Sequence, residues 1–108
     1  MDIDQKWGND LNEAKIEKCL HIYFEGRVQG VGFRYTASYL ARKYQIKGWV
    51  MNLPDGRVEL IGQGYSQQLD KFLQELKNEF SGYITKMSLQ KIPPSSEFHN
   101  FQIRFYSY

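Results

Sequence analysis

Residues 20–34, with the sequence LHIYFEGRVQGVGFR, predict a strand, a glycine-rich turn and the start of a helix. Leu20, Ile22 and Phe24 alternate with more polar residues, the period of two that is typical of a half-buried strand. Three glycines within seven residues follow, and glycine permits backbone torsions that other residues avoid. The apolar residues after the turn recur at helical spacing and predict an amphipathic helix; they are Phe33, Ala37, Leu40, Ala41 and Tyr44.

The rest of the chain continues this alternation of elements. We predict strands at about residues 46–52, 57–62 and 101–106, and a further strand within 83–92. A second helix, which Ser66 is placed to cap, carries an apolar stripe: Leu69, Phe72, Leu73, Leu76 and Phe80. Because two helices can cover only one face of such a sheet, this order indicates an α+β two-layer sandwich.

Length and composition exclude several classes of protein. The 108 residues suffice for one domain, and no run of about 18 apolar residues could span a membrane. With one cysteine, Cys19, and no signal peptide, we expect a cytoplasmic protein without a disulfide or a protein-bound metal. Residues 1–18 carry a net charge of −2 and are interpreted as an N-terminal extension, either a short helix or a disordered tail. The domain itself is expected at 19–108.

The segment 26–54 has five basic residues and no acidic one, which suits a small anion better than a long polyanion. Its glycine-rich turn leads into a helix N-terminus, whose partial positive charge favours a bound anion. Arg34 falls in the first turn of that helix, where a cation opposes the helix dipole. A bound phosphate would make this position favourable for the arginine, because guanidinium binds phosphate through two parallel hydrogen bonds. The alternative is a flexible connection with an exposed arginine.

Two motifs give these residues a specific interpretation. Residues 26–34, GRVQGVGFR, resemble the signature loop of the acylphosphatase family, and residues 48–59, which contain GWVMN and DGRVE, resemble its second signature. The resemblance covers about residues 19–105. It implies a ferredoxin-like α/β sandwich with a mostly antiparallel sheet and both helices on one face. It also implies a hydrolase that converts acyl phosphates into a carboxylate and inorganic phosphate.

The same resemblance implies roles for individual residues. Arg34 and the backbone N–H groups of a loop hold the phosphoryl group, and Asn52 orients the attacking water through its side-chain amide. The loop residues are Val28, Gln29, Gly30, Val31, Gly32 and Phe33. Read without the family, Asn52 is a turn-forming residue ahead of the Leu-Pro-Asp-Gly turn at 53–56. The family often has glycine where this chain has Gln45, at the exit of the first helix.

This chemistry agrees with what the chain lacks. An acyl phosphate expels a carboxylate whose conjugate acid has a pKa of about 4, so no protein acid need protonate it. Positioning and charge stabilisation dominate such transfers, and we expect neither a metal nor another cofactor. We hypothesise that a phosphate oxygen of the substrate accepts the proton of the water, which predicts a flat rate profile across neutral pH. His21 and His99 are interpreted as surface or strand residues, and Cys19 as a small apolar residue.

Two alternatives stay open at this point. The first is a non-catalytic phosphate- or RNA-binding module, in which outward-facing Tyr23 and Tyr106 would stack on bases, although the aromatic run of RNA-binding sheets is missing. The second is an acylphosphatase-like domain that serves a larger carbamoyl-phosphate-handling protein, for which 108 residues leave no room. The expected partner is a small-molecule acyl phosphate, with no nucleic acid, no membrane and a monomeric chain.

Overall fold

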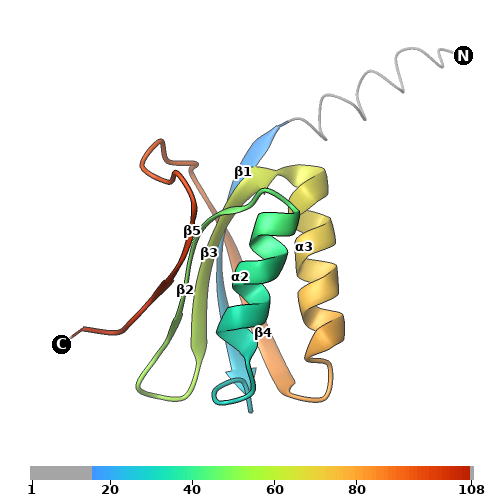
Figure 1. Ribbon diagram of the computed structural model, residues 1–108, viewed down its shortest axis with the longest axis vertical. Helices are drawn as coiled ribbons and strands as arrows, with labels where there is room; N and C mark the ends of the chain where they lie inside the picture. The colour runs from blue at the N-terminus through green and yellow to red at the C-terminus, as the bar shows by residue number, and fades with distance from the viewer. Residues whose placement is uncertain (1–15, 108) are drawn as a thin grey trace, which may run out of the picture.

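The computed structural model describes residues 16–107, which form a five-stranded sheet with two helices on one face (Figure 1). The element order and the two-layer α+β architecture predicted from the sequence are confirmed. In chain order the elements are β1 Glu17–Gly26, α2 Phe33–Lys43, β2 Lys47–Asn52, β3 Val58–Tyr65, α3 Ser66–Glu79, β4 Ile84–Ile92 and β5 Phe101–Arg104.

The strand order places two loops at the same end of the sheet. The order is β4-β1-β3-β2-β5, and every neighbouring pair is antiparallel except β2 and β5. Because β1 and β2 both run antiparallel to the central strand β3, they run in the same direction. The loop that follows β1 and the turn that follows β2 therefore lie at one end, which is the lower end in Figure 1.

The core lies between the sheet and the two helices. Alternate residues of β1 and β3 face the helices, as the period-two pattern predicts, and Phe24, Val58 and Leu60 are fully buried. Phe33, the first residue of α2, packs its ring 4.9 Å from that of Phe24, measured between centroids. This packing anchors the N-terminus of α2 against β1, so the glycine-rich loop between them has two fixed ends.

Three predicted details are wrong. Ser66 does not cap α3 but is its first residue, because β3 continues to Tyr65, which pairs with Glu17 and occupies the cap position without a side-chain hydrogen bond. For the same reason β3 extends three residues beyond the predicted end at 62. The last strand ends at Arg104 rather than at 106, because its ladder with β2 ends at the pair Met51 and Arg104.

The predicted N-terminal extension, residues 1–18, lies for the most part outside the described residues, and β1 already begins at Glu17. Neither helix in residues 16–107 combines the length and the apolar character needed to cross a membrane.

Candidate active site

The loop between β1 and α2 is shaped by glycines in the left-handed region. Gly30 has a φ of 76° and Gly32 a φ of 83°, which residues with a Cβ rarely adopt. A Cβ at either position would meet no atom within 4 Å, so backbone conformation, not space, requires glycine here. Gly32 is also the N-cap of α2, and its carbonyl oxygen accepts a 3.0 Å hydrogen bond from the Thr36 N–H.

The backbone N–H groups of residues 28–33 have no acceptor. Within residues 16–107, none of them donates a hydrogen bond to a backbone or side-chain atom. The first turn of α2 also holds no acidic residue that would neutralise the helix dipole. Consecutive N–H groups that lack an acceptor beside a helix N-terminus are an arrangement that can bind an anion.

Arg34, the second residue of α2, stands beside this loop. It is half-buried and makes no ion pair with any carboxylate of the described residues. Instead its guanidinium carbon lies 5.6 Å from the centre of the Phe105 ring, a cation–π contact. Phe105 directly follows β5, the edge strand that pairs with β2, and the residue is 76% exposed.

Asn52 is the last residue of β2 and opens the turn to β3. The residue is half-buried, and its Oδ1 atom is fully buried without a hydrogen-bond partner within the described chain. A buried acceptor that is left unpaired costs about 1–3 kcal/mol. Such an atom is suited to accept a hydrogen from a bound water molecule.

The turn after Asn52 is held by several hydrogen bonds. The Leu53 N–H donates to the Arg57 carbonyl at 2.8 Å. The Asp55 carboxylate accepts from the backbone N–H of Arg57 at 3.1 Å and from its Nε at 2.8 Å, and these bonds hold the pKa of Asp55 below its usual value. Gln29, in the glycine-rich loop, donates from Nε2 to the carbonyls of Leu53 and Arg57. The loop and the turn are thus joined directly.

Comparison with known proteins shows the family to which this chain belongs. A sequence model of the family described as acylphosphatase matches residues 20–103, which include the loop, Arg34 and Asn52. The chain belongs to the acylphosphatase family. Acylphosphatases hydrolyse acyl phosphates, so membership of the family makes this chain an enzyme.

Individual acylphosphatases match over most of their length. The chain is 41% identical to an acylphosphatase of Pediococcus pentosaceus over 78 residues, which are 70% of this chain and 87% of the relative. It is 38% identical to one of Burkholderia thailandensis over 96 residues, 88% and 96% of the two chains. The crystal structure of acylphosphatase from Bacillus subtilis superimposes with a TM-score of 0.74 at 38% identity and covers 81% of this chain and 98% of that one. The predicted family and its ferredoxin-like fold are therefore confirmed.

The other chemically reactive side chains lie away from the loop. Cys19 is 1% exposed, and burial raises the pKa of its thiol, which agrees with a small apolar residue. His21 lies on β1 with its Nε2 2.6 Å from a carboxylate oxygen of Glu59, and exposed His99 lies in the segment before β5. Tyr23 does face away from the helices, but the Arg57 guanidinium carbon lies 4.5 Å from its ring centre and covers it. No cluster of three or more potential metal ligands occurs in residues 16–107.

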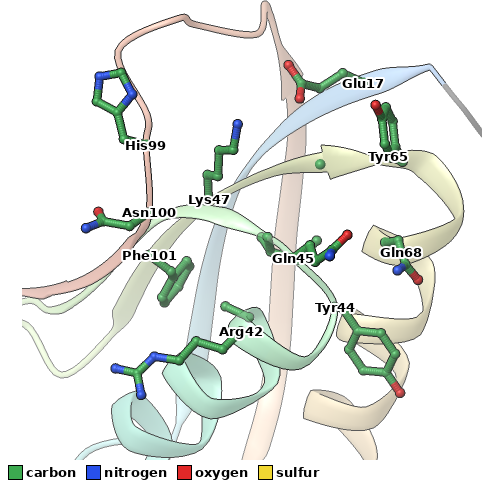
Figure 2. A pocket seen from close by; sticks show the side chains of 13 residues that line it. Glu17, Arg42, Tyr44, Gln45, Lys47, Tyr65, Gln68, His99, Asn100 and Phe101 are labelled. Carbon is green, nitrogen blue, oxygen red and sulfur yellow. The ribbon is translucent and has the colours of Figure 1, made fainter.

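A cavity of about 620 Å³ lies at the opposite end of the sheet (Figure 2). Its lining includes Glu17 and Lys47, the first residues of β1 and β2, and His99. None of residues 28–34 lines it, and neither does Asn52. The hollow in Figure 2 is therefore separate from the loop that carries the family's first signature.

Sequence reasoning missed two contacts of the candidate site. The sequence places Gln29 in the loop by its backbone but does not indicate the two hydrogen bonds that its side chain makes to the turn. Phe105 was expected to continue the last strand, and its position over Arg34 depends on β5 pairing with β2. For the first contact the only local signal was a polar amide in a glycine-rich turn. For the second it was an aromatic residue after a short strand.

Proposed function

We propose that this acylphosphatase holds the phosphoryl group of its substrate with Arg34 and the N–H groups of residues 28–33, while Asn52 orients the attacking water. The observation that carries the proposal is the buried Oδ1 of Asn52, which has no hydrogen-bond partner in the part of the chain that the structure describes. An amide oxygen accepts a hydrogen from water and leaves a lone pair of the water oxygen free to attack. The hydrogen bonds of Gln29 keep this asparagine and the loop in one structural unit.

The reaction proceeds in line at phosphorus. The water oxygen forms a bond to phosphorus as the bond between phosphorus and the acyl oxygen breaks, and the bonding electrons leave with the carboxylate. Negative charge spreads over the phosphoryl oxygens in the transition state, where the free N–H groups and the guanidinium stabilise it. The proton of the water passes to a phosphoryl oxygen, which releases inorganic phosphate.

Hydrolysis in ¹⁸O-labelled water tests where the water attacks. With benzoyl phosphate as substrate and a chelator present, we expect rapid turnover with the label in inorganic phosphate and none in benzoate, as measured by mass spectrometry. Label in benzoate would mean attack at the carbonyl carbon and would overturn the proposal. Loss of turnover on addition of the chelator would contradict the expected independence from metals.

The proton transfer predicts how the rate depends on pH. Because the substrate accepts the proton, kcat should change less than about twofold between pH 5.5 and 8.5, with no limb near the ordinary histidine pKa of about 6.5. His21 and His99 are both placed away from the loop, so His99→Asn should leave this profile unchanged. A steep limb near pH 6.5 would show that an imidazole takes part and would exclude proton transfer to the substrate alone.

A further inference from the structure

The side chain of Gln29 makes a connection that its place in the phosphate loop does not require. Its backbone belongs to the loop, yet its amide leaves the loop and reaches the turn between β2 and β3. Nε2 donates to the Leu53 carbonyl oxygen at 2.8 Å and to the Arg57 carbonyl oxygen at 3.0 Å. The primary amide supplies the two N–H donors that these two acceptors need.

The two carbonyls belong to Leu53 and Arg57, the first and last residues of the turn between β2 and β3. Leu53 follows Asn52 directly, and its own N–H donates to the Arg57 carbonyl, so the two acceptors of Gln29 are already locked to each other. Across the ladder, Asn52 itself pairs with Val58, the residue after Arg57. The Gln29 amide therefore bonds to the residue that follows Asn52 and to the residue that precedes its ladder partner Val58.

No other side-chain hydrogen bond joins these two parts. Within the described residues, Gln29 alone connects the loop at 27–32 with the segment 52–58 by a side-chain hydrogen bond. The loop otherwise attaches elsewhere, since the Arg27 N–H donates to the Tyr83 carbonyl at 2.9 Å and its guanidinium lies over the Tyr83 ring. Among side-chain hydrogen bonds of the described residues, those of this one amide are therefore the direct link between loop and turn.

We propose that the side chain of Gln29 is a positioning residue that sets the distance between the loop-bound phosphoryl group and the water held by Asn52. The inference rests on the proposed roles of the loop and of Asn52. An in-line attack requires the water oxygen at about 3–3.5 Å from phosphorus, and a displacement of about 1 Å can cost about 100-fold in rate. Gln29 acts through the turn and does not itself touch the reacting atoms.

A double-mutant cycle with Asn52 tests this role, with benzoyl phosphate as substrate. Gln29→Met keeps the length of the side chain but removes both donors, and we expect kcat to fall about 10-fold while inhibition by inorganic phosphate changes less than about threefold. In the Asn52→Ala background the same substitution should lower kcat less than about twofold, because no oriented water is left to misplace. Gln74→Met, on the exposed face of α3, is the matched control and should leave both constants unchanged.

Gln29→Glu provides a second readout if the methionine variant folds poorly. An ionised glutamate has no donor for the two carbonyls, whereas a protonated one has a single O–H donor. We expect kcat of this variant to be low at pH 7 and to rise severalfold toward pH 5, while wild-type kcat stays flat. Because an ionised glutamate in the loop also repels the anionic substrate, the recovery is measured in kcat at saturating substrate and separately from the inhibition constant of inorganic phosphate.

Three results distinguish the possible failures. An equal effect of Gln29→Met in both backgrounds would mean that the side chain only shapes the phosphate loop, which overturns the inference. An unchanged kcat in folded Gln29→Met and Gln29→Glu would also overturn it. If Asn52→Ala alone leaves kcat unchanged, the proposed role of Asn52 fails first, and the inference about Gln29 fails with it.

Discussion

The two ends of the sheet differ in how their polar groups are satisfied. At the end that carries the family signature, the N–H groups of residues 28–33 and the Oδ1 of Asn52 have no partner in the described chain. At the other end, which holds the cavity of about 620 Å³, a buried polar side chain is fully paired. Gln63, which is buried on β3 behind this end, bonds to Glu17 and through both amide atoms to the backbone of Ser95. The unsatisfied donors and acceptors, and not the presence of a hollow, are what support the proposal that the signature end binds the substrate.

The connection from α2 to β2 shows the same contrast in the backbone. The Ile46 N–H donates to the Ala41 carbonyl at 2.7 Å and the Gln45 N–H to the Arg42 carbonyl at 3.3 Å, which is a Schellman motif that satisfies the helix end. At the start of the same helix, the first N–H groups have no acceptor within residues 16–107. The C-terminal end of α2 at Lys43–Ile46, beside the cavity, is therefore closed by hydrogen bonds, and we call it the closed end. The N-terminal end at Gly32–Arg34, beside the loop, is the open end.

The largest expected effect follows from removing the cation at the open end. Arg34→Ala should lower kcat/KM about 1,000-fold and weaken inhibition by inorganic phosphate, because both substrate and transition state carry the charge that it binds. Arg42→Ala, on the same helix beside the cavity, is the control and should change kcat/KM less than twofold. Comparable losses in steady-state kinetics of both variants would mean that the ends do not differ as proposed.

A smaller effect is expected at Asn52. Asn52→Ala should lower kcat about 100-fold and leave the inhibition constant of inorganic phosphate within about twofold, because the water and not the phosphoryl group loses its partner. Asn100→Ala, which alters an exposed amide of the cavity, should affect neither constant. If phosphate inhibits Asn52→Ala much more weakly than wild type, then Asn52 binds the phosphoryl group as well.

The contact between Phe105 and Arg34 is expected to matter less. An exposed cation–π contact is worth about 0.5–1 kcal/mol, so Phe105→Leu should lower kcat/KM about two- to fivefold by loosening the guanidinium. Phe105→Tyr keeps the ring and should match wild type. A loss of activity in the tyrosine variant equal to that in the leucine variant would show that the ring face is not what holds Arg34.

The smallest effect on activity is expected at the closed end. Gln45 has a φ of 59°, a left-handed conformation that costs about 1 kcal/mol for a residue with a Cβ. Gln45→Gly should raise the melting temperature by about 4–8 °C without changing kcat, as measured by circular dichroism and benzoyl phosphate assay. Gln45→Ala retains the strain and should give no such gain. A stabilised variant with altered kcat would show that the two ends are coupled.

The pattern of the sequence was sufficient to predict the individual helices and strands, but it did not predict which strands pair with one another or how far the pairing extends. The period-two alternation at Leu20, Ile22 and Phe24 predicted β1, and the stripe through Leu69, Phe72 and Leu76 predicted α3, because each pattern reflects burial of one face of one element. The cap at Ser66 was predicted wrongly because the pairing of β3 with the start of β1 carries the strand to Tyr65. That pairing involves residues far apart in sequence, which local patterns do not report.

By itself the sequence determined the conformation of the glycine-rich loop, since glycines at 30 and 32 permit its left-handed torsions. It also determined that Arg34 lies at a helix start and that Asn52 precedes a turn. Only the tertiary structure decided that these residues share one end of the sheet, that Gln29 bonds to the turn beside Asn52, and that Phe105 covers Arg34. The physical reason is that torsions and periodicity are set by neighbouring residues, whereas strand order and register are set by packing between distant ones.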